Sequence, residues 1–115
     1  MRMWMVDPLL LCDRHLLGEH VETHMLAGTL ARGRSIDGYI AKDLLEPASL
    51  GQRHDRLAAE MLARGFRHES PLPRADLSHL PDTARAHRVD AEAALHALTE
   101  RCEACRLRVA AFGRG

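Results

Sequence analysis

Aromatic residues and net charge are both scarce in this sequence. Of 115 residues only Trp4, Tyr39, Phe66 and Phe112 are aromatic, so leucine, alanine and methionine must fill the core, which favours packed helices over a sheet. Lysine plus arginine and aspartate plus glutamate each number 16, which gives a formal net charge of zero. The chain therefore lacks the strongly basic field with which most DNA-binding domains attract phosphates. Any contact with DNA would have to come from local basic patches.

Long hydrophobic runs and a full set of paired cysteines are missing as well. No stretch approaches the roughly 20 uncharged apolar residues that a membrane span needs, and the N-terminus has no hydrophobic segment followed by a small-residue cleavage site. We therefore expect a cytoplasmic protein. The three cysteines argue against a disulfide framework, because an odd count leaves one thiol over and the cytosol keeps thiols reduced. We expect free thiols.

What is present indicates an all-α fold. A chain of 115 residues is the size of one domain, so we expect a compact single helical domain over residues 1–115, with three main helices and long connecting loops. Prolines forbid a regular helix between residues 68 and 81, where we expect an extended loop. Glycines that follow a periodic apolar stretch end the first two helices. The expected helices cover residues 8–32 with Asp7 as cap and Gly33 as stop, residues 49–64 with Gly65 as stop, and residues from 82 or 83 to about 111.

Three polar side chains form a stripe on the first expected helix. His15, Glu19 and Glu22 follow one another at i, i+4 and i+7, which places them on one narrow face of a helix that is otherwise largely apolar. Two carboxylates and an imidazole on a buried helix each lose hydration, so they must be paired, hydrogen-bonded or open to a cleft. The stripe is therefore a candidate site. The alternative is that it forms only the solvated side of an amphipathic helix.

Two further patterns are typical of metal ligands. His20 and His24 form an i, i+4 pair on the opposite face of the helix, and Cys102 and Cys105 form a Cys-x-x-Cys pair. A structural zinc site needs a second ligand pair at suitable spacing, and no partner pair is evident in the sequence. We therefore interpret the histidines as hydrogen-bonded structural residues and the two cysteines as core residues, and we predict no bound metal.

Three blocks of the sequence resemble the pyrimidine-dimer DNA glycosylase (phage-type endonuclease V) family. Arg2 together with the run DRHLLGEHVE from Asp13 to Glu22 is similar to the family's opening, without a gap. The run LAAEMLARGF (residues 57–66) resembles its second long helix, and DLSHLP (76–81) resembles the loop before its last helix. These blocks keep the family's order over about residues 1–108. The family's short bacterial members are more similar still, through HLLGEH (15–20), Arg53-His54, Met61 and HESPL (68–72).

This resemblance implies an enzyme that removes a damaged base from double-stranded DNA and cleaves the strand at the abasic site, with no cofactor. In the family the free N-terminal α-amine attacks the sugar C1′ and forms an imine, and a glutamate assists. These roles correspond to Met1 and Glu22, provided that Met1 is retained, which the large Arg2 side chain favours. An α-amine is less basic than lysine, so a useful fraction is a free nucleophile near neutral pH. A neighbouring carboxylate can stabilise the cationic imine.

The resemblance also implies substrate contacts through Arg2 and His15, whereas Glu19 is expected to pair with a basic side chain. The family's first helix carries two arginines that contact the DNA backbone, and Val21 and Met25 replace them here, so we expect fewer phosphate contacts. Other arginines could build a substitute patch, and we predict Arg53 and the adjacent His54 as substrate-binding residues of that patch. Its candidate members are Arg32, Arg34, Arg53, Arg56 and Arg64.

A function of a different class stays open. A non-catalytic helical binding protein or metal-binding protein on the same scaffold would account for the eight histidines and for Cys12 close to His15 and Glu19. The N-terminus distinguishes the two hypotheses. The repair function needs a free Met1 amine and tolerates loss of the cysteines, whereas metal binding predicts the reverse.

Overall fold

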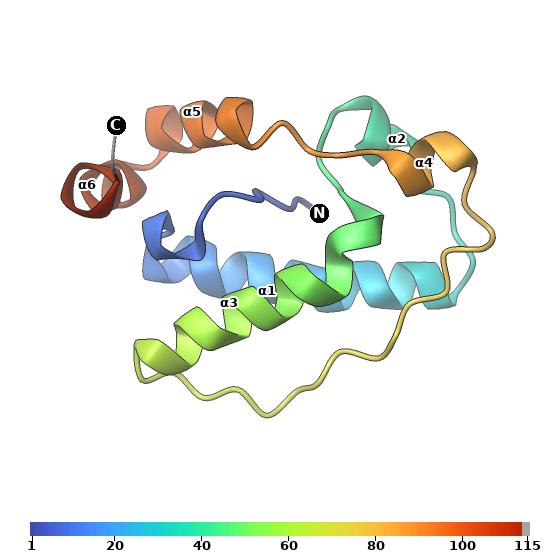
Figure 1. Cartoon of the computed structure of the whole chain (residues 1–115), viewed down its shortest axis with the longest axis horizontal. Coiled ribbons are helices and arrows are strands. Elements are labelled where there is room, and N and C mark those ends of the chain that lie inside the picture. Colours follow the sequence, from blue (N-terminus) through green and yellow to red (C-terminus); the bar gives the residue numbers. More distant parts are fainter. Residues whose placement is uncertain (114–115) are drawn as a thin grey trace.

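The computed structural model describes residues 1–113 and is helical, without a strand, over that part of the chain (Figure 1), so the predicted all-α fold class is confirmed. None of the helices described is long and apolar enough to cross a membrane. The longest helices, α1 and α3, lie against each other, and shorter helical segments complete the fold. The elements are η1 (Pro8–Leu10), α1 (Asp13–Ala31), α2 (Asp37–Ala41), η2 (Pro47–Ser49), α3 (Leu50–Ala63), α4 (Asp82–Ala86), α5 (Ala91–Arg101) and α6 (Glu103–Phe112).

The first helix begins later than predicted. Asp7 does act as a cap, since its side chain accepts a hydrogen bond from the backbone N–H of Leu9, but it caps only the 3-10 turn η1. The chain is then extended at Leu11 and Cys12, and α1 starts at Asp13. Burial explains the interruption, because Leu11 is 0% exposed and its extended backbone lets it enter the core.

The predicted ends of the two long helices are confirmed. Gly33 and Gly65 have φ angles of +67° and +86°, a left-handed conformation that glycine adopts without a steric penalty. After Gly65 the chain folds back, and the backbone N–H of Phe66 donates to the carbonyl of Met61 at 2.9 Å. The segment that follows is extended up to the turn before Pro81, as the prolines predicted.

The third predicted helix is wrong, because the structure divides it into α4, α5 and α6. The first break is an extended linker held by two carboxylates of a distant loop. His87 Nε2 lies 2.6 Å from Asp43 Oδ1, the N–H of Val89 donates to Glu46 at 2.8 Å, and the N–H of Asp90 donates to Asp43 at 3.1 Å. These bonds replace the helical hydrogen bonds that a continuous helix would have made.

The second break lies at Cys102, which has an extended backbone and separates α5 from α6. Its side chain caps α6 by accepting a hydrogen bond from the N–H of Cys105. Both breaks depend on partners far away in the sequence, so local periodicity does not reveal them.

The N-terminal segment, residues 1–7, passes through the middle of the molecule (Figure 1) and links two hydrophobic clusters. Met3 packs in one cluster, around Leu26, Leu45 and Leu50, while Trp4 and Val6 pack in the other. The N–H of Met3 also donates to the carbonyl of Leu44 at 2.8 Å. This packing fixes where the α-amine of Met1 lies.

Candidate functional site

The fold brings the N-terminus to Glu22 on α1. Burial raises the pKa of the half-buried Glu22, the ammonium of Met1 opposes that shift, and Glu19 adds to it. Arg2 also lowers the pKa of Glu22, through a hydrogen bond from its backbone and through the charge of its guanidinium. The net direction is upward. The α-amine of Met1 and the carboxylate of Glu22, the two groups predicted as catalytic, therefore interact electrostatically.

Backbone strain accompanies this arrangement. Met5 has a φ of 58°, in the left-handed region that costs a non-glycine residue about 1–3 kcal/mol. The burial of Met3, Trp4 and Val6 on either side offsets that cost. The N-terminal segment is thus held in a defined shape although it contains no regular secondary structure.

Arg2 also lies at this site. Its guanidinium carbon sits 3.8 Å from the centre of the Trp4 ring, a cation–π contact. Its Nε is buried and has no hydrogen-bond partner in the described structure. Burial and then Arg101 lower the pKa of Arg2, whereas Asp43 and Glu22 raise it. Arg101, at the end of α5, is a neighbouring cation that sequence reasoning missed, because nothing in the sequence places that helix end near the N-terminus.

The predicted structural role of Glu19 is confirmed by an ion pair with Arg53. Nε and Nη2 of Arg53 donate to the two carboxylate oxygens of Glu19 at 2.6 and 2.9 Å, and Nη1 donates to the carbonyl of Val6 at 2.6 Å. Glu19 and Arg53 are 1% and 2% exposed. The structure therefore puts Arg53 in the interior, between α1, α3 and the N-terminal segment, and not on a surface open to substrate. There it supports the segment that carries Met1.

His54 belongs to a histidine cluster on the other side of α1. Side-chain nitrogens of His20, His24, His54 and His68 all lie within 4.8 Å of one another, a geometry that could hold a metal ion. Residues 20 and 24 are each about 200° around the helix from Glu22, so the cluster that contains His54 lies on a different face of α1. Hydrogen bonds satisfy His20 and His24 less fully than predicted, because the Nε2 atom of each is buried without a partner in the described structure, while His24 also interacts with the backbone of Ser70. Burial, followed by the neighbouring histidines, lowers the pKa of His20 to about 4.

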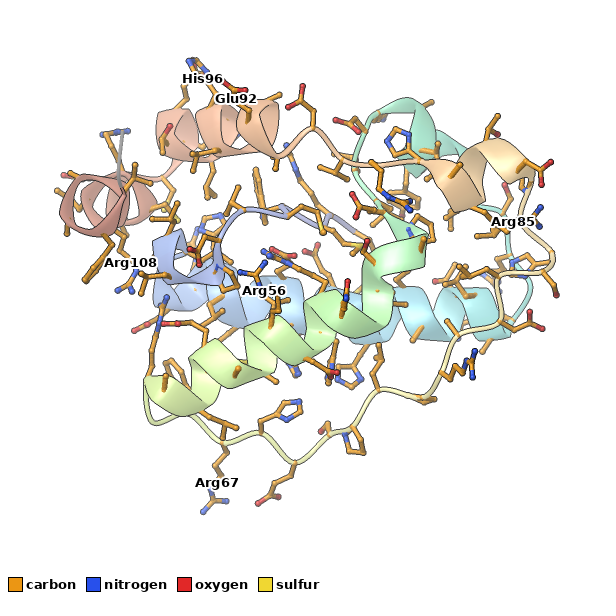
Figure 2. The ribbon with its side chains drawn as sticks, viewed as in Figure 1. Arg56, Arg67, Arg85, Glu92, His96 and Arg108 are labelled. Atoms are coloured by element: carbon orange, nitrogen blue, oxygen red, sulfur yellow. The ribbon has the colours of Figure 1, made fainter. Side chains whose placement is uncertain are left out.

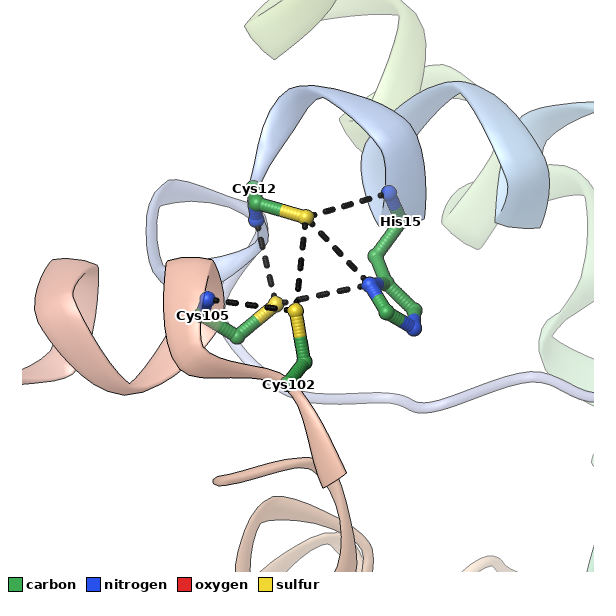
Figure 3. A group of neighbouring side chains, drawn as sticks. All are labelled: Cys12, His15, Cys102 and Cys105. Carbon is green, nitrogen blue, oxygen red and sulfur yellow. Dashed lines mark hydrogen bonds between the residues drawn. The ribbon is translucent and has the colours of Figure 1, made fainter. Parts of the chain in front are cut away.

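His15 turns its Nδ1 towards sulfur (Figure 3). This nitrogen lies 3.3 Å from the Sγ of Cys12 and 3.6 Å from the Sγ of Cys105, and Cys102 completes the group. The imidazole of His15 also contacts the ring of Trp4 in an edge-on arrangement, with a centroid distance of 5.8 Å. The three thiols are free, as predicted. Cys12 and His15 therefore form the second ligand pair beside Cys102 and Cys105, which was not evident from the sequence.

The predicted arginine patch is not assembled. Arg53 is buried, and Arg64 binds Glu60, Asp13 and the carbonyl of Pro8. Other arginines lie in separate parts of the molecule, as Figure 2 shows for Arg67, Arg85 and Arg108, and the last two donate to the carbonyls of Leu80 and Leu9. Positive charge beside Glu22 comes instead from Met1, Arg2 and, near Arg2, Arg101.

The α1 surface next to Glu22 is apolar. Val21 and Met25, which stand where the family has arginines, are 56% and 52% exposed. This side of Glu22 therefore presents apolar surface, whereas the positive charge beside Glu22 comes from Met1 and Arg2.

The pyrimidine dimer DNA glycosylase family model matches residues 1–74 of the 115-residue chain, and the chain belongs to that family. The matched segment contains Met1, Arg2, Glu19, Glu22 and Arg53, so both candidate catalytic groups lie within it. It ends before α4, so Cys102 and Cys105 lie outside it. No curated protein and no solved structure matches the chain.

Proposed function

We propose that this protein is a DNA repair glycosylase with abasic-site lyase activity, and that its nucleophile is the α-amine of Met1. The observation that carries the proposal is the electrostatic interaction of that amine with Glu22, inside the segment that matches the family. The substrate is damaged double-stranded DNA, with a UV-induced pyrimidine dimer as the lesion that the family name indicates. Recognition of another damaged nucleotide is the alternative within this class.

The amine displaces the base, and the imine that it forms then promotes cleavage of the strand. The lone pair of the amine attacks C1′ of the damaged nucleotide, the C1′–N bond breaks, and the base leaves with that electron pair and takes up a proton. The amine then loses a proton, the C1′–O4′ bond breaks as the nitrogen lone pair forms the C=N bond, and O4′ takes up a proton, which leaves a cationic imine between Met1 and C1′. Removal of a proton from C2′ then expels the 3′ phosphate by β-elimination, and water hydrolyses the imine to regenerate the amine.

Glu22 is suited to assist at each of these stages. Its carboxylate stabilises positive charge on the sugar and on the imine, and it can take the proton from C2′. Partial burial favours this role, because the charge interaction is stronger where water is excluded. Arg2 and Arg101 would hold a phosphate next to the opened sugar. Arg53 would act at a distance, by fixing Glu19 and the backbone of Val6.

The chain offers few competing nucleophiles. Lys42 is its only lysine, so the α-amine of Met1 and the ε-amine of Lys42 are the only primary amines that could form an imine. A test of the nucleophile therefore has to distinguish only these two amines.

The test of function is strand incision. The purified chain would be incubated at low salt with three duplexes: one irradiated with UV, one with a single abasic site and one undamaged. The proposal expects incision of the first two and not of the third. Incision of the abasic duplex alone would support the abasic-site lyase activity and exclude the pyrimidine dimer as the lesion. Failure to cut either damaged duplex would contradict the proposal.

A non-catalytic helical binding protein or metal-binding protein on the same scaffold is the second candidate. Two groups of side chains favour it, because each could hold a metal ion: one of four histidines, and one of three cysteines with His15. Stoichiometric metal in a chain that incises neither damaged duplex would select this candidate.

A further inference from the structure

Two ligand pairs far apart in the sequence meet at one point. Cys12 and His15 begin α1, Cys102 and Cys105 begin α6, and each pair is separated by two residues. Cys12 and Cys102 are 90 residues apart, yet their sulfurs lie 3.9 Å from each other. The four ligand atoms, three sulfurs and Nδ1 of His15, all lie within 4.8 Å of one another (Figure 3). All three cysteines of the chain belong to this one group.

The backbone around the sulfurs is arranged to receive negative charge. Cys12 accepts a hydrogen bond from the N–H of His15 at 3.5 Å, and Cys102 accepts one from the N–H of Cys105 at 3.4 Å. The N–H of Cys12 donates to the Sγ of Cys105 at 3.3 Å. Each sulfur therefore accepts one backbone N–H, and two of the sulfurs cap the positive ends of helices. These features stabilise thiolates, the form of cysteine that binds metals.

We propose that Cys12, His15, Cys102 and Cys105 bind one zinc ion as a structural Cys3His site. Three thiolates and one imidazole are a preferred tetrahedral ligand set for zinc, and four protein ligands leave no open position for a substrate. Three thiols release three protons on binding, so the occupied site carries a net charge of −1. The hollow beside Cys12 is lined by two arginines, Arg14 and Arg108, and by one acidic residue, Asp13, so positive charge lies close to the site.

The site lies where α6 packs against η1 and the start of α1. It fastens α6 to the start of α1, and its histidine contacts Trp4, the residue on which Arg2 stacks. Zinc would thus stabilise the shape of the N-terminal segment without taking part in the reaction. The site does not depend on the proposed DNA chemistry, since neither Met1, Glu22 nor Arg2 is among its ligands.

The test is the metal content and spectrum of the full chain. The chain purified without a polyhistidine tag would be analysed for metals, and then loaded with Co²⁺ in place of zinc. We expect one zinc per chain, and for the cobalt form an intense thiolate-to-metal charge-transfer absorption with the visible bands of tetrahedral cobalt. Absence of stoichiometric metal, even after zinc is added under reducing conditions, would overturn the proposal.

Variants separate this site from the histidine cluster. Cys102 is half-buried, so Cys102→Ser is less disruptive than a change at the fully buried Cys105. We expect Cys102→Ser to bind zinc at least tenfold more weakly and to lose part of the charge-transfer band, and Cys102→His to keep tetrahedral binding. His24→Gln, the matched change in the histidine cluster, should keep both the zinc and the band. Metal lost in His24→Gln but retained in Cys102→Ser, or a cobalt spectrum without thiolate bands, would place the ion elsewhere and overturn the proposal.

Discussion

Arg53 on α3 and Glu19 on α1 form a two-bond ion pair in the interior, and the same guanidinium holds the carbonyl of Val6. One side chain therefore ties together the two longest helices and the segment that carries the N-terminal amine. Loss of either partner would leave the other charge buried and unpaired, so the pair is sensitive to a change at one residue alone.

Removing Arg53 should destabilise the fold strongly. In Arg53→Met the carboxylate of Glu19 stays buried without a partner, and we expect the free energy of unfolding in urea to fall by about 3–5 kcal/mol. The double variant Glu19→Leu/Arg53→Met removes both charges and should recover most of that loss. Arg56→Met is the matched surface control, because Arg56 is exposed and lies 4.0 Å from Asp7, and it should change stability by less than about 1 kcal/mol. Equal effects of Arg53→Met and Arg56→Met would contradict this account.

Glu22 should matter for chemistry and not for folding. We expect Glu22→Gln to lower the incision rate by about 10²- to 10⁴-fold, the usual contribution of a positioned acid or base. The rate would be measured in single-turnover assays, with binding of the abasic duplex followed separately and expected to change little. Glu100→Gln, on the exposed face of α5, is the matched control and should incise normally. Full activity in Glu22→Gln would remove Glu22 from the mechanism.

Incision should also decline in acid. Burial raises the pKa of Glu22 above the ordinary glutamate value, so the required carboxylate is lost at a higher pH than for an exposed glutamate. The rate should fall as the pH is lowered through that raised pKa, and a profile over the acid range would measure it. The sign for stability is opposite: a carboxyl with a raised pKa in the folded state favours folding when protonated, and this contribution is lost as the pH rises. Glu22→Gln should therefore be no less stable than the parent chain at neutral pH.

Restoring charge on α1 should strengthen DNA binding. Val21 is exposed beside Glu22, and Val21→Arg adds a cation where the family has one. If the new guanidinium reaches a phosphate, the slope of log K against log salt should steepen by about 0.9, with tighter binding at low salt. Leu62→Arg adds the same charge on α3, at another exposed apolar position, and should leave the slope nearly unchanged. Identical slopes for the two variants would show that DNA does not approach Val21.

Zinc removal should loosen the C-terminal part of the chain. α6 is fastened to α1 by the proposed site, so chelation should lower Tm by more than about 5 °C, the shift that a loss of 1–2 kcal/mol gives in a small domain. Limited trypsin digestion should then cut first near Arg101, at the junction of α5 and α6. An unchanged Tm and digestion pattern after complete removal of the metal would exclude a stabilising role for it.

Local signals predicted the features that depend on neighbours in the sequence. Gly33 and Gly65 end their helices because a left-handed residue is required there, and Asp7 caps the turn that follows it. The division of the last helix was not predictable in this way. It depends on hydrogen bonds from residues 87–90 to Asp43 and Glu46, which lie more than 40 residues earlier.

The site was predictable only in part, for the same reason. Helical spacing and the family resemblance together singled out Glu22 and assigned Glu19 a basic partner, which the structure identifies as Arg53. Spacing alone could not distinguish a buried arginine from a substrate-facing one. The meeting of Cys12 and His15 with Cys102 and Cys105 was missed because the two pairs are 90 residues apart, although each has the spacing of a zinc ligand pair.

The central claim, that the Met1 amine forms an imine with DNA, is tested most directly by borohydride trapping. The chain would be mixed with abasic duplex and with UV-irradiated duplex, reduced with borohydride, and the crosslinked peptide identified by mass spectrometry. The account predicts a crosslink at Met1, retained in Lys42→Arg and lost when extra residues extend the N-terminus. A crosslink at Lys42, or none to either duplex at low salt, would contradict it.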